Sequence, residues 1–381
     1  MTRPRIFLSI NSAWNVYNFR AGVIRALIDS GFEVIAATPP DQYEPRLTSL
    51  GCRYIPLPMD NKGSSPVRDL LLMSRYWRLL RRERPDVFLG YTIKPNVYGS
   101  LVAHILGIPV VNNISGLGTA FHSDTWLLRL VKALYRVSLR RSHTVFFQNE
   151  EDRRLFVAEK LVRMGQTGLI PGSGIDLARF SSGPAPTEEL PQPFRFLLVG
   201  RLLWDKGVRE YVEAARIVLR QEPDTRFELL GFLEVDNRAA IPRCKVEEWV
   251  SEGLIDYLGV TDDVRPHLSR ADCVVLPSFY REGTPRSLLE AAAMGKPIVT
   301  TDWIGCRNVV DHGVNGYLCK PRDAQDLAEK MLAMIRLPPA NRRSMGAAGR
   351  AKMEREFDEG IVIRRYLEVV DDIVAGKRTS R

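Results

Sequence analysis

Two carboxylates, Glu282 and Glu290, stand eight positions apart in the run SFYREGTPRSLLEA. Between them, Gly283, Thr284 and Pro285 predict the start of a helix, with Thr284 as its N-cap and Pro285 as its first residue. The amino end of a helix offers backbone N–H groups and a partial positive charge, which suit a diphosphate. The two carboxylates could then hold hydroxyl groups at both ends of a nucleotide sugar. The alternative is an exposed helix with solvated glutamates.

Two cations bracketed by glycines, Arg201 and Lys206 in the run GRLLWDKG, follow a predicted strand and precede a predicted helix. Cations at such a turn can neutralise the charge that accumulates on a leaving diphosphate, and Arg can do so bidentately. The alternative is a surface ion pair with Asp205. The chain has no Asp-x-Asp pair, so we expect these cations to replace a divalent metal and we expect no metal site.

The elements that must position these residues alternate between strands and helices along the whole chain. Strands are predicted at 5–10, 32–38, 53–57, 86–91, 110–114, 144–148 and 168–170, and again at 195–199, 226–230, 256–258, 273–277 and 297–301. Helices are predicted between them, among others at 21–30, 69–84, 96–106, 127–141, 208–221, 245–252, 285–294, 324–336 and 359–374. This alternation predicts an α/β fold with doubly wound parallel sheets.

A segment rich in Pro, Ser and Gly at 181–193 predicts a linker between two such sheets. We therefore expect a first domain at 1–183, a second at 191–358 and a terminal helix at 359–381. Two α/β domains joined there would leave a deep cleft, and ligands of open parallel sheets bind outside the carboxyl ends of the strands.

The composition, with 381 residues of which 45% are hydrophobic and 26% charged, excludes a disordered chain, a fibre and a membrane-spanning bundle. Five scattered cysteines without a CxxC pair argue against a zinc or disulfide framework and favour a reducing compartment. The first residues lack the apolar run of a signal peptide. These features predict a cytoplasmic protein.

The net charge of +9 is uneven. Residues 1–190 hold 24 Lys and Arg against 16 Asp and Glu, whereas residues 191–381 hold 30 against 29. A basic first half indicates nucleic acid, a phosphorylated substrate or a membrane surface as partner, unless it is merely solvated. Two basic amphipathic segments, 68–84 and 125–149, could rest on anionic lipid, and we expect their apolar faces to pack on the first sheet.

The second half resembles the retaining GT-B glycosyltransferases of family 4 over most of residues 195–320. The motifs that carry this resemblance are GRL-x-x-x-KG from Gly200, DCVVLP from Asp272, EG-x-P-x-x-x-x-EA from Glu282, MGKPIV from Met294, Gly305-Cys306-Arg307 and Asn315-Gly316. Further motifs resemble the branch that builds bacterial surface polysaccharides, namely NFR from Asn18, YTIKPN from Tyr91, ISGLG from Ile114 and PGSGID from Pro171.

The resemblance implies a GT-B fold, in which two Rossmann-like domains face a cleft and the terminal helix crosses back to the first domain. Members of this branch commonly add a hexose or N-acetylhexosamine from a UDP-sugar to a polyprenyl-diphosphate-linked saccharide. The UDP-sugar is a substrate, so no cofactor is expected. The enzyme would work at the cytoplasmic face of the inner membrane, as a peripheral protein on an anionic membrane surface, and without nucleic acid.

The resemblance also assigns roles to residues. Arg201 and Lys206 would bind the donor diphosphate, Glu290 the ribose hydroxyls, and Glu282 the transferred sugar together with the backbone of Gly283, Thr284 and Pro285. Gly116 would lie across the cleft, close to the diphosphate, and residues 256–261 near the base. Because the family's acceptor is a lipid diphosphate, Arg20 and Lys94 are candidates for gripping it, and structural roles for both remain open.

Two positions depart from the family pattern. Ser115 stands where many members have a His, and Asn308 stands where this branch often has a Glu. A double displacement would need a carboxylate nucleophile, for which Glu282 is the one candidate. We favour same-face attack, in which the leaving phosphate oxygen takes the proton of the acceptor hydroxyl and the protein supplies position and electrostatics.

Two other functions fit parts of the sequence. Sugar-nucleotide 2-epimerases share the GT-B architecture, but the spacing of Glu282 and Glu290 argues for transfer. A non-enzymatic protein that binds nucleic acid or membrane would explain the basic first half, but no nucleic-acid-binding motif accompanies the charge.

Overall fold

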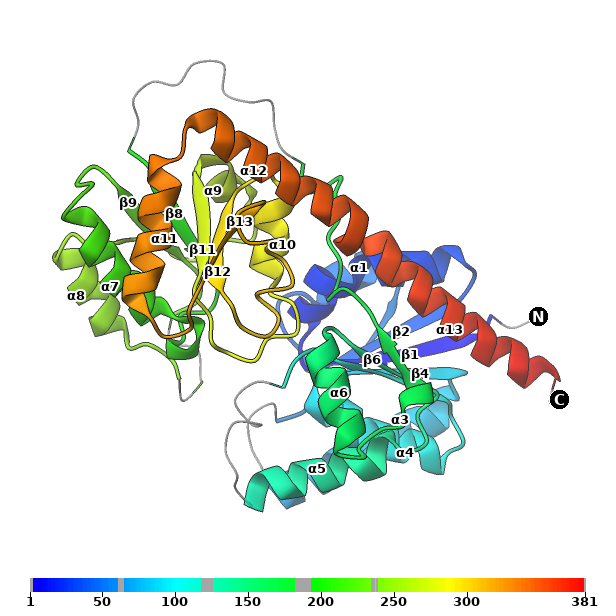
Figure 1. Ribbon diagram of the computed structural model, residues 1–381. Coiled ribbons are helices and arrows are strands. Elements are labelled where there is room, and N and C mark those ends of the chain that lie inside the picture. Colours follow the sequence, from blue (N-terminus) through cyan, green and yellow to red (C-terminus); the bar gives the residue numbers. More distant parts are fainter. Residues whose placement is uncertain are drawn as a thin grey trace. The chain divides into compact units, whose positions relative to one another are not determined.

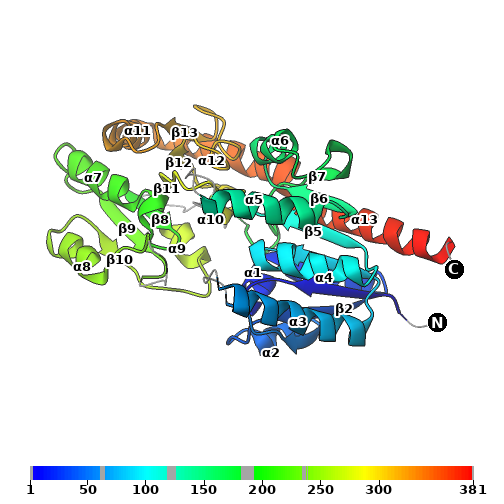
Figure 2. The same cartoon turned by 90° about the horizontal axis from the view of Figure 1, so that it is seen from below.

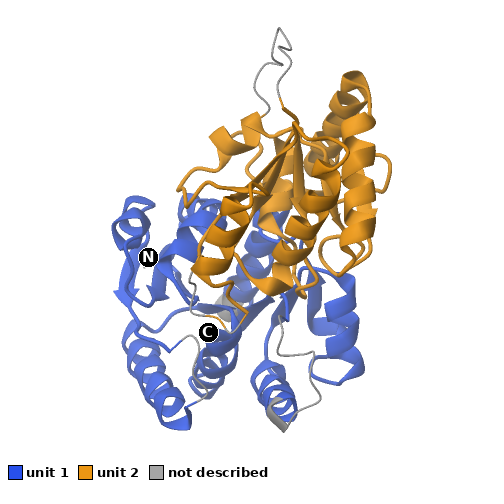
Figure 3. Ribbon diagram, turned by 90° about the vertical axis from the view of Figure 1, so that its left-hand side faces the viewer, with its two compact units in different colours: residues 1–174, 359–381 blue, residues 175–358 orange. Residues whose placement is uncertain are grey.

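The computed structural model describes residues 3–60, 65–117, 126–181, 193–233, 237 and 239–379. The chain forms two compact units (Figure 3), of which unit 1 comprises Met1–Gly174 with Glu359–Arg381 and unit 2 comprises Ile175–Asp358. Within the described residues, unit 1 has a seven-stranded sheet and unit 2 a six-stranded sheet. All neighbouring strands in both sheets run parallel. The predicted α/β class with two parallel sheets is therefore confirmed.

The sheet of unit 1 has the strand order β3-β2-β1-β4-β5-β6-β7. Its strands are β1 (Arg5–Ser9), β2 (Glu33–Thr38), β3 (Arg53–Pro56), β4 (Val87–Tyr91), β5 (Val110–Ile114), β6 (Thr144–Phe147) and β7 (Thr167–Leu169). Successive residues of β1 enter different cores, since Phe7 packs on one face of the sheet and Ile6 and Leu8 pack on the other. Both faces are buried, which explains the nearly continuous apolar strands in the sequence.

The helices of unit 1 form two layers on its sheet (Figures 1 and 2). They are α1 (Ala13–Asp29), α2 (Glu44–Ser49), α3 (Pro66–Glu83), the π-helical turn η1 (Pro95–Gly99), α4 (Ser100–Ile105), α5 (Trp126–Leu139), α6 (Glu150–Ala158), the 3-10 turn η3 (Met164–Gln166) and α13 (Glu359–Thr379). Residues of α1 and α13 share one core cluster with the sheet, and residues of α3, α4 and α5 belong to clusters on the other face. Helix α1 begins earlier than predicted, because the Ser12 side chain caps it by accepting from the N–H of Asn15.

The sheet of unit 2 has the strand order β10-β9-β8-β11-β12-β13. Its strands are β8 (Arg195–Val199), β9 (Arg226–Leu230), β10 (Asp256–Tyr257), β11 (Cys273–Leu276), β12 (Ile298–Thr301) and β13 (Gly316–Cys319). The sequence did not predict β13. Its first residue, Gly316, lies so close to β12 that an added Cβ would stand 2.2 Å from the carbonyl oxygen of Ile298. The pairing itself makes this short segment a strand.

The helices of unit 2 also cover both faces of its sheet. They are the 3-10 turn η4 (Trp204–Lys206), α7 (Val208–Leu219), α8 (Arg243–Ser251), α9 (Arg265–Arg270), α10 (Arg286–Ala293), α11 (Ala324–Arg336), α12 (Pro339–Lys352) and the π-helical turn η5 (Met353–Phe357). Residues of α7, α8 and α11 pack in one core cluster, and residues of α9, α10 and η5 pack in another. Within the described ranges, each helix of the protein is too short or too polar to cross a bilayer.

The chain changes from unit 1 to unit 2 between Gly174 and Ile175. Residues just after this point are tied to unit 2, since the N–H of Ile175 donates to the Phe357 carbonyl at 2.8 Å. Arg350 donates to the carbonyls of Leu177 and Phe180, so both belong to unit 2 although the predicted first domain extended to residue 183. Most of the predicted linker, residues 182–192, lies outside the described residues.

Helix α13 belongs to unit 1, where it packs against α1 and β4. Its buried residues Val362, Tyr366 and Val370 are part of the core that β1 and α1 build. The side chain of Asn113, in β5, donates to the Tyr366 hydroxyl at 2.9 Å. The last helix of the chain therefore completes the core of the unit that the first residues begin.

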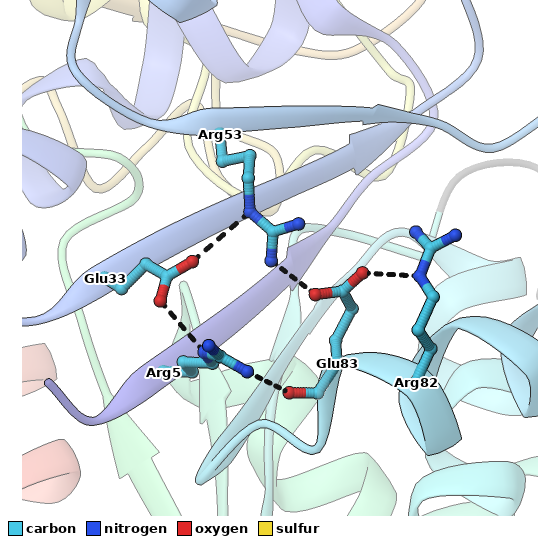
Figure 4. A network of polar contacts seen from close by, with 5 residues as sticks. All are labelled: Arg5, Glu33, Arg53, Arg82 and Glu83. Atoms are coloured by element: carbon cyan, nitrogen blue, oxygen red, sulfur yellow. Dashed lines mark hydrogen bonds and ion pairs between the residues drawn. The ribbon is translucent and has the colours of Figure 1, made fainter. Parts of the chain in front are cut away.

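A charged network joins the first residues of three strands of unit 1 to the end of α3 (Figure 4). Glu33 accepts from Arg5 at 2.9 Å and from Arg53 at 3.2 Å. The buried carboxylate of Glu83 pairs with Arg53 and accepts from Arg82 at 2.7 Å. The Arg53 hydrogen bond, with a smaller contribution from Arg82, lowers the pKa of Glu83 although burial acts against it. The network fixes the amino edge of this sheet.

Candidate active site

The predicted donor residues of unit 2 lie at the carboxyl ends of two neighbouring strands, β8 and β11, of its sheet. β8 and β11 are neighbours, but the chain leaves β8 toward β9 and leaves β11 toward β12, on the opposite side. Ligands of open α/β sheets bind outside the carboxyl ends of strands at such a switch point. The segment Arg201–Gly207 follows β8, and the segment Pro277–Pro285 follows β11. The topology of unit 2 thus brings the two sequence motifs to one edge of its sheet.

Gly207 allows these two segments to touch. Its φ angle is +75°, and a Cβ at this position would stand 2.0 Å from the carbonyl oxygen of Pro277. Only glycine adopts this conformation without strain and leaves room for the Pro277 backbone. Next to this contact, the carbonyl of Asp205 accepts from the N–H groups of Phe279 and Tyr280, at 3.0 and 2.9 Å. The backbone itself therefore fixes the distance between the two motifs.

Lys206 and Glu282, one from each motif, form an ion pair. Their side chains are 12% and 13% exposed, so the pair is largely removed from water. The hydroxyl of Ser278 donates to the same carboxylate oxygen of Glu282 at 3.2 Å. Buried ions need such partners, because an isolated charge is costly to remove from water. The ion pair places one cation and one anion just beyond the carboxyl end of β11.

Tyr280 lies between the two predicted cations. The ring centroid is 5.6 Å from the Nζ atom of Lys206. Burial, together with the negative charge of Glu282, raises the pKa of the Tyr280 hydroxyl, and the nearby Arg201 guanidinium acts in the opposite direction. Arg201 itself is exposed. Tyr280 could not be predicted as a site residue, because an aromatic residue in a loop carries no signal of its own.

Gly305 and Cys306 support the loop that carries Glu282. Gly305 has a φ angle of +84°, and an added Cβ would lie 2.6 Å from the Gly283 carbonyl oxygen. The buried thiol of Cys306 has its pKa raised to about 12, chiefly by burial and also by the charge of Glu282. This thiol is therefore protonated at neutral pH. Gly305 and Cys306 therefore pack closely against the loop that carries Glu282.

Glu290 lies on α10 and pairs with Arg286, one turn earlier, at 3.1 Å. Its side chain is 14% exposed. Burial raises the pKa of Glu290, and Arg286 opposes that effect. The helix begins one residue later than predicted, since Pro285 rather than Thr284 occupies the N-cap position and accepts from the N–H groups of Leu288 and Leu289. Helix ends commonly differ by one residue between definitions, and the predicted order of the motif is unchanged.

A third loop, after β13, also reaches this edge and was not predicted. The Arg322 guanidinium lies 4.5 Å from the ring centroid of Phe279, whose backbone bonds to Asp205. Arg322 has a φ angle of +60°, a conformation that costs a residue with a side chain more than it costs glycine. Burial raises the pKa of Glu210, and the positive charges of Arg209 and Arg322 offset part of this increase. A strained residue at this place supports the Glu282 loop from the side.

The remaining predicted residues lie in unit 1. Gly116 follows β5 with a φ angle of +117°, and the adjacent Ser115 donates to the Asn113 side chain at 2.8 Å. Gly116 thus stands in a backbone conformation that favours glycine.

The two acceptor candidates are built differently. Arg20 is 3% exposed and lies over the ring of Tyr91, with 4.6 Å between the guanidinium carbon and the ring centroid. Among the described residues, its Nε has no hydrogen-bond partner. Lys94 pairs with the buried Asp69 at 2.6 Å. The structure therefore gives both cations contacts within unit 1.

Two family models match the chain. The model described as a glycosyl transferase 4-like domain matches residues 19–172, and the model described as glycosyl transferases group 1 matches residues 193–336. Together they span the strands and helices of both units that carry the predicted residues.

Relatives in two bacteria resemble the chain over much of its length. It is 29% identical to the N,N'-diacetylbacillosaminyl-diphospho-undecaprenol alpha-1,3-N-acetylgalactosaminyltransferase of Campylobacter jejuni, with 97% of this chain and 98% of that protein covered. It is 26% identical to the UDP-Gal:alpha-D-GlcNAc-diphosphoundecaprenol alpha-1,3-galactosyltransferase of Escherichia coli, with 69% of each covered.

Solved structures share the fold. The Anabaena protein HepE, crystallised in complex with UDP, has a TM-score of 0.78 at 19% identity and covers 97% of this chain and 100% of its own. A glycosyltransferase from Rickettsia africae has a TM-score of 0.80 at 15% identity, with 98% and 99% covered. With its two parallel-sheet units and both domain models, the chain belongs to the GT-B glycosyltransferases of family 4.

Proposed function

We propose that this glycosyltransferase moves a hexose or N-acetylhexosamine from a UDP-sugar to a polyprenyl-diphosphate-linked saccharide, with retention at the anomeric carbon. The product would be an intermediate of cell-surface polysaccharide or glycan assembly. The proposal draws on the relatives in C. jejuni and E. coli, whose names describe transfer to diphospho-undecaprenol-linked sugars. The observation that carries it is the Lys206–Glu282 pair at the switch point of the second sheet.

The donor is proposed to bind at the carboxyl ends of β8 and β11. Arg201 and Lys206 would neutralise its diphosphate, and Glu290 would accept hydrogen bonds from the ribose hydroxyls. Glu282, with the backbone of Gly283, Thr284 and Pro285, would hold the sugar. The exposed Arg201 would exchange its contact with the Tyr280 side chain for one with the diphosphate, and Lys206 is already held at the same edge by Tyr280 and Glu282.

Same-face attack suits this geometry better than double displacement. Glu282 is paired with Lys206 and hydrogen-bonded by Ser278, so its charge is stabilised and its oxygen is a weakened nucleophile. The leaving phosphate oxygen would take the proton of the acceptor hydroxyl, and the two cations would stabilise the charge that grows on the diphosphate. We expect this step to need no divalent metal.

The acceptor is proposed to bind to unit 1. Its diphosphate requires cations, and Arg20 and Lys94 are the candidates there, with Gly116 close to the donor diphosphate. Binding at Lys94 would compete with its ion pair to Asp69. We also propose that the enzyme works as a peripheral protein at the cytoplasmic face of the inner membrane, where a lipid-linked acceptor resides, and that nucleic acid is not a partner.

A transfer assay tests the proposed function. The protein is incubated with UDP-GalNAc, UDP-GlcNAc, UDP-Gal or UDP-Glc and a polyprenyl-diphosphate-sugar acceptor, and the linkage is determined by NMR. We expect one donor to be transferred with retention, and activity to persist in EDTA. A changed sugar in the absence of any acceptor would indicate an epimerase instead. Complete loss in EDTA that magnesium restores would refute the metal-free step.

Two variants test the donor site. Arg201→Ala and Glu290→Ala are each expected to weaken UDP binding by about tenfold or more, which corresponds to the loss of one charged hydrogen bond. Thermal unfolding of Arg201→Ala should match that of the unchanged protein, because Arg201 is exposed. Glu290→Ala should remain folded by circular dichroism but unfold at a lower temperature, because it breaks the largely buried ion pair with Arg286. If both variants bind UDP with unchanged affinity, the donor does not bind at this edge of the sheet.

A further inference from the structure

Helix α3 has two apolar sides, and only one of them packs on the sheet. Leu72, Tyr76 and Leu80 are buried in the core of unit 1. A second set of large apolar side chains faces outward, with exposed fractions of 75% for Val67, 66% for Leu70, 46% for Leu71 and 38% for Trp77. Positions three, four and seven apart lie on one side of a helix. The outward side therefore carries a second apolar stripe, interrupted by Ser74, that the core does not explain.

The charges on this outward side are positive. Both acidic residues of α3 are buried, where Asp69 pairs with Lys94 and Glu83 pairs with Arg53. The exposed charged residues of the helix are arginines, namely Arg68, Arg78, Arg81 and Arg82. Arg68 is paired with Asp60 and Arg82 with Glu83, whereas no ion pair involves Arg78 or Arg81 within the described parts of the chain.

The same character continues onto the neighbouring helices. α3, α4 and α5 lie side by side on one face of the sheet (Figure 2), and His104 of α4 contacts the Ser138 carbonyl of α5 at 2.9 Å. Ile105 is 66% exposed, and Leu130 and Val137 are 46% and 62% exposed. Exposed cations accompany these apolar residues at Arg129, Arg136, Arg140 and Arg141. The sequence has no acidic residue between Thr125 and Asn149.

We propose that this outer surface of α3, α4 and α5, the α3–α5 face, docks on a bilayer surface rich in anionic lipid. Leu70, Leu71 and Trp77 would enter the headgroup boundary, and Arg78 and Arg81 would meet lipid phosphates. Interleaved apolar residues and cations without exposed acids on α3 match such a surface in both polarity and charge. The inference rests on the proposed function, since a lipid-linked acceptor gives the enzyme a reason to stay on a membrane.

Binding to vesicles tests the α3–α5 face. The full chain is sedimented with vesicles of equal parts phosphatidylcholine and phosphatidylglycerol, and with vesicles of phosphatidylcholine alone. We expect clear preference for the anionic vesicles and loss of most binding at high ionic strength, because salt screens the charges. Equal binding to both kinds of vesicle, or none to either, would overturn the proposal.

Two paired variants separate the apolar and the charged contributions. Leu70→Asn with Leu71→Asn should weaken partitioning by more than about tenfold, since each buried CH2 group contributes to insertion. Arg78→Gln with Arg81→Gln should weaken it by about 25-fold, at about fivefold for each cation. The matched controls are Val250→Asn, at a 42% exposed position on α8, and Arg220→Gln, at an exposed position after α7. Controls that weaken binding as much as the test variants would contradict the assignment.

Two further measurements distinguish other outcomes. Sedimentation velocity of the unchanged chain and of the leucine variant reports whether the α3–α5 face joins two copies of the chain. If only the unchanged chain forms a dimer, this face is a dimer interface and not a membrane-docking surface. Transfer to a short-chain, water-soluble acceptor should be unchanged in both variants, whereas transfer to an acceptor embedded in anionic vesicles should fall. If the unchanged chain transfers to neither acceptor, the proposed function fails, and the vesicle result stands by itself.

Discussion

Gly207 brings the loop that carries Arg201 and Lys206 against the loop that carries Glu282. At this contact the shape of the site depends on a missing side chain, because any Cβ would overlap the Pro277 carbonyl. Gly200, at the other end of the same motif, has open space around the corresponding position. The two glycines of one motif thus have different roles.

Replacing each glycine by alanine tests this difference. Gly207→Ala is expected to weaken UDP binding by about tenfold or more, because a left-handed residue with a side chain costs about 1–2 kcal/mol and the loop must also retreat from Pro277. Gly200→Ala should change UDP affinity by less than about threefold. Calorimetric titration with UDP measures both. Equal effects would show that the contact with Pro277 does not shape the site.

Burial and the ion pair with Arg286 have opposite effects on the pKa of Glu290. Burial raises the pKa of this carboxyl, and Arg286 lowers it. If ionised Glu290 binds the ribose hydroxyls, donor affinity falls as the pH drops through this pKa. Arg286→Gln removes the lowering effect, so the loss of affinity should begin at a higher pH than in the unchanged protein.

The measurement is the dissociation constant of a UDP-sugar between pH 5 and 8, since its diphosphate, unlike that of UDP, does not titrate in this range. Glu290→Gln serves as the control and should give a flat profile. If donor affinity begins to fall at the same pH in Arg286→Gln as in the unchanged protein, the charge of Glu290 does not govern donor binding.

At the scale of elements, the amino edge of the first sheet depends on the ion-pair network of Arg5, Glu33, Arg53, Arg82 and Glu83 (Figure 4). Three strands start in this network, and α3 ends in it. Glu83 is the buried member, and its partners lower its pKa. A carboxylate with a lowered pKa stabilises the fold at pH values above its ordinary pKa, and this contribution disappears as the pH falls through the lowered value.

Glu83→Gln should therefore destabilise unit 1 by about 1.5–3 kcal/mol at neutral pH, the usual contribution of hydrogen bonds to a charged group. The difference from the unchanged protein should stay constant down to the ordinary pKa of 4.5 and close below it. Urea unfolding at several pH values measures the difference. If the difference in free energy of unfolding between the two proteins increases on acidification, the direction given for the pKa shift of Glu83 is wrong.

At the scale of the whole molecule, the chain leaves unit 1 at Gly174, builds unit 2, and returns at Glu359. Unit 2 is continuous in sequence and contains the proposed donor residues except Gly116, which belongs to unit 1. Unit 1 is discontinuous and needs α13, which buries Val362, Tyr366 and Val370. The two units therefore depend differently on the end of the chain.

A chain that stops at Asp358 is expected to keep a folded unit 2 that binds UDP within about tenfold of the full-length affinity. Unit 1 should lose its cooperative unfolding, because the apolar residues that α13 covers become exposed. Calorimetry and UDP titration report the two units separately. The milder variant Tyr366→Phe, which removes the hydroxyl that accepts from Asn113 and interacts with Tyr91, should lower stability by about 1 kcal/mol. A truncated chain that unfolds exactly as the full chain does would contradict this division.

The local patterns of the sequence were sufficient for the strands and for the family motifs. Val110–Ile114 and Arg195–Val199 have the predicted bounds, because buried parallel strands are short apolar runs with clear ends. The strand at Gly316–Cys319 could not be predicted, since a glycine-led run of four residues becomes a strand only by pairing with β12. The same holds for Arg322, whose place beside Phe279 depends on where β13 ends.

Residue types and short spacings were enough to predict the alternation of elements, the two donor motifs and their order. The partners of the charged residues, in contrast, follow from the packing of the folded chain. Lys206 meets Glu282 across 76 positions of sequence, and the acids of α3 turn inward while its second apolar stripe stays outside. Such choices depend on which strands become neighbours and on which helix face finds the sheet, and periodicity along one segment carries no information about either.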